Sequence, residues 1–152
     1  MQPQSPDYLA ALERHGIRPS AQRLAIATFV LGTEEHPSAE LVWSRVRAVF
    51  PMVSRATVYN TLQLFVEKGL LRALTLAEGC TVYDPNVLPH HHFLDTASGG
   101  IRDVPWTALT VAGVGELAAA EDLEVEAFSV VLRGRRRGGS PDPSPQPKES
   151  QS

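Results

Sequence analysis

The chain has 152 residues, of which 43% are hydrophobic, and a formal net charge of −3 at pH 7. This length suits one ordinary domain or two small ones, and the apolar content is enough for a packed core. A net negative charge argues against non-specific coating of nucleic acid, although it leaves room for a locally basic reading surface. The single cysteine, Cys80, excludes an internal disulfide and a multi-cysteine zinc site. The sequence shows no signal peptide and no apolar run of transmembrane length, so we expect a cytoplasmic protein without a membrane partner.

Apolar periodicity and capping residues predict three helices in the first third of the chain. Their expected bounds are Ser5 to about Gly16, Pro19 to Gly32, and Ser38 to the residue before Pro51. The four residues at the N-terminus are expected to be frayed. In the third helix the apolar residues are expected to face inward, and these are Leu41, Val42, Val46 and Val49.

The segment from Ser54 to Gly69 has the features of a complete fourth helix. Ser54 is a suitable N-cap, and Gly69 stands where a left-handed C-cap belongs. One apolar stripe should face the core, and it consists of Val58, Leu62, Phe65 and Val66. Much of the opposite side is polar and basic. Such a helix is either an ordinary amphipathic helix or one that enters the major groove of DNA, where its first turns would meet base edges.

Two strand-like runs follow, Leu71–Leu76 and Cys80–Tyr83, joined by a turn in which Gly79 can adopt a positive φ. Helices followed by a β-hairpin are typical of a winged-helix domain, whose wing can contact phosphates. We therefore expect an N-terminal winged-helix DNA-binding domain over residues 1–84. A hinge should follow over residues 85–89, which contain two prolines and several turn formers.

Residues 90–133 predict a small C-terminal α/β domain, so the whole chain is expected to be an α+β protein. Strands are expected at His90–Asp95, Gly100–Val104 and Glu124–Leu132, with a helix over Val111–Glu121. A unit of this size is too small to be very stable alone. We therefore expect it to share a core with a second copy and to dimerise the protein. Residues 134–152, rich in Gly, Ser, Pro and charge, are expected to form a disordered tail.

A run of three histidines, His90-His91-His92, is the strongest chemical signal in the second half of the chain. Side chains alternate along a strand, so His90 and His92 should share one face and His91 should take the other. A pair of imidazoles on one face is a common start to a metal site, and the alternative is a solvated polar patch. Further candidate donors are His36, Asp84 and Asp103.

Four segments together resemble the ferric uptake regulator (Fur) superfamily. These segments are Arg18-Pro19-Ser20-Ala21-Gln22-Arg23, Ala56-Thr57-Val58-Tyr59-Asn60-Thr61-Leu62, Val82-Tyr83-Asp84 and His90-His91-His92-Phe93. The resemblance covers roughly residues 8–133. Within the superfamily the chain looks most like the peroxide regulator PerR and the iron response regulator Irr. The residues that indicate this are Tyr59-Asn60, the triple histidine and Ile101-Arg102-Asp103-Val104-Pro105.

The resemblance implies a regulatory metal site, whose ligands fall on His36, Asp84, His90, His92 and Asp103. Imidazole nitrogens and carboxylate oxygens suit Fe²⁺ or Mn²⁺, with Zn²⁺ able to compete. In the family, Asp at the last ligand position is associated with peroxide sensing, and this chain has Asp103. By the same analogy, peroxide would oxidise a ligand histidine, His36 or His90, in the iron-loaded protein.

The chain departs from the family pattern at the structural zinc. Two Cys-x-x-Cys pairs hold this zinc in most members, but here the first pair falls on Asp95 and Ser98 and no cysteine follows Leu132. We therefore expect no structural four-cysteine zinc. The chain also lacks the histidine of an additional metal site on the last strand. A Cys-Pro haem motif is missing too, because Thr81 follows Cys80.

The resemblance thus implies a metal-dependent transcriptional repressor rather than an enzyme. Its Fe- or Mn-loaded homodimer is expected to bind a palindromic double-stranded DNA operator and to respond to peroxide. An iron- or haem-status regulator of the Irr type is the alternative within the family. A small metalloenzyme, or a storage or protein-interaction module, is the alternative outside it, although no base paired with a nucleophile is evident. The residues expected at the DNA are Arg18, Arg23, Arg55, Thr57, Tyr59 and Asn60, with Arg18 and Arg23 on phosphates.

Overall fold

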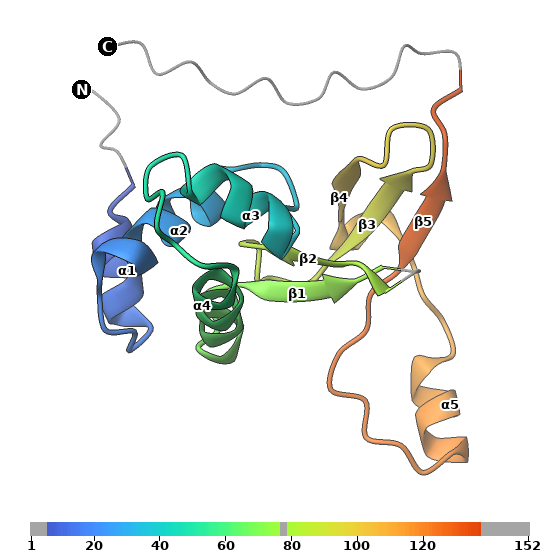
Figure 1. Cartoon of the computed structure of the whole chain (residues 1–152). Helices are drawn as coiled ribbons and strands as arrows, with labels where there is room; N and C mark the ends of the chain where they lie inside the picture. The colour runs from blue at the N-terminus through green and yellow to red at the C-terminus, as the bar shows by residue number, and fades with distance from the viewer. Residues whose placement is uncertain (1–5, 77–78, 138–152) are drawn as a thin grey trace, which may run out of the picture. The chain divides into compact units, whose positions relative to one another are not determined.

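The computed structural model describes residues 6–76 and 79–137, which form two compact units that divide between Val87 and Leu88. Figure 1 labels the helices and strands of both units. The predicted frayed N-terminus, two residues of the predicted hairpin turn and most of the predicted tail lie outside the described residues. Within the described ranges, no helix has the length and apolar character that a membrane span needs.

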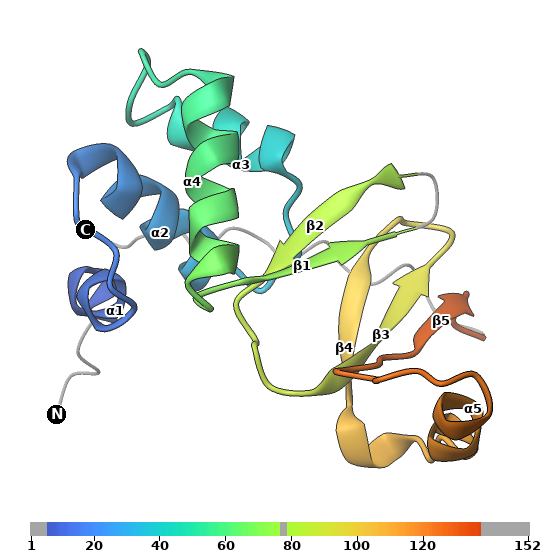
Figure 2. The ribbon, with the colours of Figure 1, turned by 90° about the horizontal axis from the view of Figure 1, so that it is seen from below.

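The first unit consists of helices and a two-stranded sheet around one apolar core. Its helices are α1 (Tyr8–Arg14), α2 (Ala21–Gly32), α3 (Ala39–Val46) and α4 (Arg55–Glu67). Helix α4 packs against both α2 and α3, as Figure 2 shows. The predicted apolar stripe of α4 accounts for much of this core, because Val58, Leu62 and Phe65 are fully buried.

Serine N-caps determine where α2, α3 and α4 begin. The hydroxyls of Ser20, Ser38 and Ser54 each accept the backbone N–H three residues further on. The predicted caps of α3 and α4 are confirmed, and Gly69 after α4 has the predicted positive φ, at +78°. The predicted starts of the first two helices are wrong by one to two residues. Asp7 caps α1 through the Ala10 N–H, because aspartate is as good an N-cap as serine.

One predicted core position of α3 is also wrong. Val42 and Val46 are buried as expected, but Val49 is 72% exposed. Helix α3 ends at Val46, so the helical period that would turn Val49 inward no longer applies.

A β-hairpin completes the first unit. Its strands, β1 (Arg72–Thr75) and β2 (Thr81–Asp84), pair antiparallel. Strand β1 is one residue shorter at each end than predicted, and β2 lies one residue further along the chain than predicted. Gly79 in the connecting turn has a φ of +74°, as predicted. The chain before α3 lies along β2, where the Tyr83 N–H donates to the Pro37 carbonyl at 3.0 Å.

The second unit is a three-stranded sheet with one α-helix. Strand β3 (His90–Asp95) lies between β4 (Ile101–Pro105), with which it is antiparallel, and β5 (Val131–Gly134), with which it is parallel. A short 3-10 helix, η2 (Trp106–Ala108), and helix α5 (Val114–Ala120) connect β4 to β5. The combination of helices with mixed sheets confirms the predicted α+β class.

The predicted third strand of this unit is largely wrong. Only its last two residues enter β5, and residues 124–130 are irregular. A strand forms where a neighbouring chain pairs with its N–H and C=O groups. The pairing of β5 with β3 begins at Val131, and before it only the Val130 carbonyl accepts a β3 backbone donor, the His92 N–H, within the described chain.

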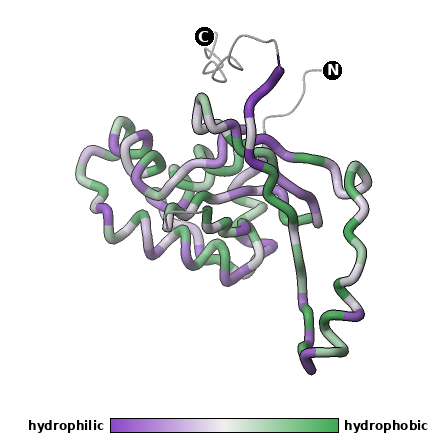
Figure 3. The backbone as a smooth tube through the Cα atoms, turned by 90° about the vertical axis from the view of Figure 1, so that its right-hand side faces the viewer, coloured by the Kyte–Doolittle hydropathy of each residue, from purple (hydrophilic) through white to green (hydrophobic). Residues whose placement is uncertain are grey.

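The second unit buries polar side chains, while its large apolar ones are half-buried or exposed. In the described chain every buried hydrophobic residue belongs to the first unit, whereas the buried residues of the second are His90, His91, His92 and Asp95. Helix α5 and the chain after it project from the sheet as an arm, and Figure 3 shows hydrophobic stretches along it. Exposed apolar residues of this unit include Trp106, Leu117, Leu123, Val125, Phe128 and Leu132. An apolar surface of this kind is typical of an interface between subunits.

The position of the core predicts how two substitutions differ. Leu62→Ala should lower the free energy of unfolding by about 2–5 kcal/mol, because it leaves a cavity between packed helices. Val49→Ala should change it by less than about 0.5 kcal/mol, because that side chain is exposed. Urea denaturation followed by circular dichroism measures both. Equal effects of the two substitutions would contradict this assignment of the core.

Candidate functional site

The first group of candidate ligands lies in the first unit, where the chain before α3 meets β2. The hydrogen bond between Tyr83 and Pro37 aligns these two segments, so their neighbours His36 and Asp84 come together. Nε2 of His36 lies 3.2 Å from Oδ2 of Asp84, and the two side chains are only 5% and 4% exposed. The other carboxylate oxygen of Asp84 accepts the Asn86 N–H at 2.9 Å. That bond orients the carboxylate, so Oδ2 points to the imidazole.

The second group lies in the second unit, on one face of the β3–β4 ladder. His92 pairs directly with Asp103, and His90 is its diagonal neighbour. Nε2 of His90 is 3.4 Å from Oδ1 of Asp103, and Nε2 of His92 is 3.7 Å from the same atom. The ligating atoms of the three residues all lie within 4.8 Å of one another. Strand alternation places the two imidazoles on one face, as the sequence predicts, and the pairing register places Asp103 beside them.

A backbone contact fixes which nitrogen of His90 carries its proton. Nδ1 of His90 lies 2.7 Å from the carbonyl oxygen of Leu88, which can only accept a hydrogen bond, so Nδ1 donates. In a neutral imidazole Nε2 then keeps its lone pair, and this atom lies 3.4 Å from Oδ1 of Asp103. Two acceptors at this distance need a proton or a cation between them. A metal-ligating histidine is commonly held by such a bond from its other nitrogen.

His91 points to the opposite face and has structural partners. Its ring stacks on Trp106 with centroids 4.6 Å apart, and its Nδ1 accepts the Val130 N–H at 3.0 Å. The hydrogen bond attaches β3 to the chain that enters β5, and the stacking attaches β3 to η2. His91 is therefore separate from the candidate ligands, which agrees with the alternation predicted for the three histidines.

The donor set of each unit fits a divalent transition metal. The first unit offers one imidazole and one carboxylate, and the second offers two imidazoles and one carboxylate. Nitrogen and oxygen donors without a thiolate suit Fe²⁺, Mn²⁺ or Zn²⁺. Neither group alone supplies the full coordination that these ions require.

At Asp95 and Ser98, where the resemblance places a zinc-binding cysteine pair, this chain forms a hydrogen-bonded turn. The Asp95 carboxylate accepts the Ala97 N–H at 2.8 Å, and the Ser98 hydroxyl accepts the Gly100 N–H at 3.1 Å. Asp95 is buried, so its hydrogen bond also offsets the desolvation of the carboxylate. These two side chains thus stabilise the β3–β4 connection without thiolates.

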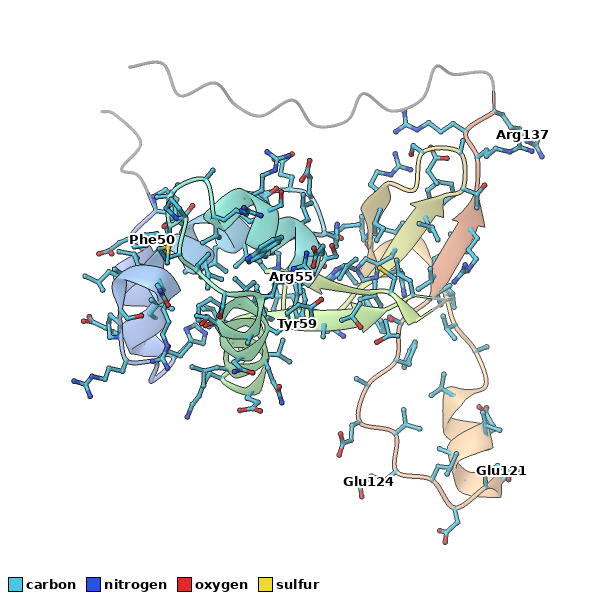
Figure 4. All side chains as sticks on the ribbon, in the orientation of Figure 1. Phe50, Arg55, Tyr59, Glu121, Glu124 and Arg137 are labelled. Atoms are coloured by element: carbon cyan, nitrogen blue, oxygen red, sulfur yellow. The ribbon has the colours of Figure 1, made fainter. Side chains whose placement is uncertain are left out.

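The residues predicted to read DNA from α4 lie along its first turns. Arg55, Tyr59 and Asn60 are exposed, and Figure 4 labels Arg55 and Tyr59. Thr57 is half-buried, and its backbone N–H and hydroxyl lie 3.0 and 2.9 Å from the Ser54 hydroxyl. Three of these four side chains are thus accessible to a ligand, while Thr57 belongs to the helix cap.

The two arginines that were expected on phosphates differ in their contacts. Arg18 is exposed, whereas the guanidinium of Arg23 donates to the Arg18 carbonyl at 2.7 Å. Arg23 therefore helps to close the turn that precedes α2. The sequence does not reveal this structural contact, because it depends on the backbone path of the turn.

Tyr59 has a neighbour on the wing. Burial raises the pKa of the Tyr83 phenol above its usual value, and the nearby Tyr59 phenol raises it further. A phenol is uncharged at neutral pH even with its usual pKa, and this rise keeps Tyr83 uncharged beside Tyr59 at more alkaline pH as well.

Comparison with known proteins identifies the family. The model of the ferric uptake regulator family matches residues 14–130 of this chain. The peroxide-responsive repressor PerR of Staphylococcus epidermidis is 31% identical over 103 residues, which is 68% of this chain and 69% of that protein. The structure of the Campylobacter jejuni peroxide stress regulator is similar with a TM-score of 0.62 and 26% identity, covering 87% of this chain and 98% of that one.

The fold agrees with this family too. The Vibrio cholerae ferric uptake regulator has a TM-score of 0.64 to this chain at 23% identity, covering 86% of this chain and 100% of that one. The family match covers both groups of candidate ligands and the α4 helix. This chain therefore belongs to the ferric uptake regulator family, as its sequence motifs predict.

Proposed function

We propose that this chain is a metal-dependent transcriptional repressor that binds a palindromic operator as a homodimer and releases it after exposure to peroxide. Two orienting contacts carry this proposal, since the Asn86 N–H orients the Asp84 carboxylate and the Leu88 carbonyl orients the His90 imidazole. Membership of the family and likeness to a protein named a peroxide-responsive repressor support it. A role at DNA implies a cytoplasmic location.

The metal would connect the two units. We propose that one Fe²⁺ or Mn²⁺ ion is bound by ligands from both units, with Zn²⁺ able to compete. The first unit would contribute His36 and Asp84, and the second would contribute His90, His92 and Asp103. An ion that needs donors from both units would restrict the hinge at residues 85–89. It would thereby set the angle at which α4 meets the major groove. A full switch of this kind requires a difference in metal affinity between the two shapes of about 5.5 kcal/mol.

A second copy of the chain would cover the apolar surface of the second unit. Leu117, Leu123 and Phe128 are exposed there, and the unit buries no large apolar side chain of its own in the described ranges. Two copies related by a two-fold axis would present two α4 helices to successive major grooves of a palindrome. Dimerisation would thus provide both the missing core and the spacing of the DNA-reading helices.

The second group of ligands is suited to a peroxide response. The Asp103 side chain is 40% exposed, so a small molecule can reach it from solvent, while His90 is buried and held through Leu88. Bound ferrous iron would supply the redox chemistry by which peroxide oxidises a ligating imidazole, that of His36 or His90. An oxidised imidazole is a poorer donor, so the metal would leave and the operator would be released.

The metal requirement gives a direct test of the repressor proposal. Manganese-loaded protein should bind a duplex selected from a random pool more tightly than chelator-treated protein does. His92→Ala should abolish this difference, because it removes a donor from the second group. Fluorescence anisotropy measures the binding, and His15→Gln, a histidine outside both groups, serves as the control. Equal binding by metal-loaded and chelator-treated protein would refute the proposal.

The peroxide response predicts a covalent product that depends on the metal. Iron-loaded protein treated with peroxide should gain the mass of one oxygen atom on the peptide that contains His36 or His90, and it should release the duplex. Manganese-loaded protein should do neither, because Mn²⁺ lacks this reaction with peroxide. Peptide mass spectrometry with parallel anisotropy measures both events. Iron-dependent binding that is insensitive to peroxide would instead favour an iron-status regulator.

A further inference from the structure

A charged and aromatic cluster lies where α3 meets the start of α4, and the proposed metal centre does not use it. The guanidinium carbons of Arg47 and Arg55 lie 4.5 and 4.4 Å from the centroid of the Trp43 ring. Nη2 of Arg55 is also 3.0 Å from Oε1 of Glu40. We refer to Glu40, Trp43, Arg47 and Arg55 as the arginine–tryptophan cluster.

The local sequence explains why these four residues meet. Glu40, Trp43 and Arg47 follow one another at spacings of three and four, so they share one face of α3 and its C-cap. The indole N–H of Trp43 donates to the Val53 carbonyl at 3.1 Å. This hydrogen bond holds the ring against the turn that enters α4. The side chain of Arg55, the first residue of α4, therefore lies beside the ring.

The cluster presents charged donors to solvent. A guanidinium that stacks on an aromatic ring is attracted by the ring face, and its N–H groups at the edge remain able to bind an anion. Arg47 is exposed, and the side chain of Arg55 is 61% exposed. Trp43 thus reduces the conformational freedom of two arginines without occupying their hydrogen-bond donors.

Glu40 pairs with one of these donors, that of Arg55, but this ion pair is weak. Its side chain is 53% exposed, and an exposed ion pair contributes only about 0–1 kcal/mol. A phosphate oxygen offers the same charge and a matching geometry for a guanidinium. An incoming phosphate can therefore take the place of the Glu40 carboxylate at little cost.

The cluster lies beside the residues that are proposed to read DNA. Arg55 and Tyr59 are four residues apart on α4, so they lie on the same side of the helix, and Figure 4 shows both. The N-terminal end of a helix also attracts anions, because its N–H groups carry partial positive charge. In a chain with a net charge of −3, contacts to a phosphate backbone have to come from such local groups.

We infer that Arg47 and Arg55 bind phosphates of the operator backbone, that Trp43 positions both guanidinium groups, and that Glu40 holds Arg55 until a phosphate displaces it. This inference rests on the proposed DNA-binding function. It assigns Arg55 to the backbone, so that Arg55 contributes affinity while the bases are read by other residues of α4. Glu40 then lowers the affinity for any duplex, which restricts binding to sites where base contacts add to the phosphate contacts.

Salt titrations of the full-length, manganese-loaded protein test the role of Arg55. Arg55→Gln should weaken binding by about tenfold for a selected duplex and for its scrambled version alike. It should also reduce the slope of log affinity against log salt concentration by about one for each bound protomer. If Arg55 contacted a base, Arg55→Gln would instead weaken binding of the selected duplex alone. An unchanged salt slope would overturn the inference.

A double-mutant cycle tests the role of Glu40. Glu40→Gln should raise the affinity about two- to fivefold, which is the range that one exposed ion pair provides. In the Arg55→Gln background the same change should have little effect, because no arginine remains to be released. Glu67→Gln, which removes a charge from the last turn of α4, is the control for net charge. An equal gain in both backgrounds would show general charge repulsion and would overturn the proposed exchange.

Two substitutions of Trp43 separate positioning from packing. Trp43→Phe keeps an aromatic face but lacks the indole donor, whereas Trp43→Leu lacks both. The Phe variant should bind both duplexes nearly as tightly as the wild type, and the Leu variant should approach Arg55→Gln in affinity and salt slope. Thermal unfolding reports whether each variant is folded. Equal binding by the two folded variants would overturn the positioning role. A wild-type protein that prefers no selected duplex would instead refute the DNA-binding function itself.

Discussion

The pairing register of β3 against β4 is the constraint on which the chemistry of the second unit depends. In the observed register His92 faces Asp103 directly and His90 faces it diagonally. A slip of one residue would turn His91 toward the carboxylate and move both candidate ligands to the other face. The contacts of His91 with Trp106 and Val130 oppose this slip, because the slip would leave a buried imidazole without its hydrogen bond. A residue outside the ligand set therefore helps to fix the ligand geometry.

The second unit also has an unusual balance of burial. Its buried side chains in the described chain are three imidazoles and one carboxylate, which gain little from leaving water, and its large apolar side chains are half-buried or exposed. Burial of polar groups stabilises a fold only when hydrogen bonds or ions satisfy them. The proposed dimer and the proposed metal would both supply stability that the isolated unit lacks. Folding of this unit would then be linked to the same two events that enable DNA binding.

Local signals made much of the fold predictable, and non-local contacts limited the rest. Serine caps located α3 and α4, and period-two alternation placed His90 and His92 on one face, because both features depend on residues close in sequence. The strand expected at Glu124–Leu132 failed, since strand formation depends on a partner that the sequence does not identify. The approach of His36 to Asp84, which are 48 residues apart, likewise could not be derived from spacing and came only from the family resemblance. For the arginine–tryptophan cluster, the i, i+4 spacing of Trp43 and Arg47 predicts that these two residues are neighbours. The addition of Arg55 depends on the turn before α4, which the spacing does not predict.

Carboxylates take part in both proposed steps of regulation, and their different burial suits different roles. Asp84 is almost fully buried beside His36, where an ionic partner is held strongly and its loss is costly. Glu40 lies at the surface, where an ion pair is weak and easily exchanged. A buried carboxylate is therefore suited to hold a metal whose departure should change the shape of the protein. An exposed carboxylate is suited to a partner such as Arg55, which must exchange that carboxylate for a phosphate each time DNA binds. On these physical grounds metal occupancy would set whether the protein can bind its operator, and the surface cluster would tune how tightly it does so.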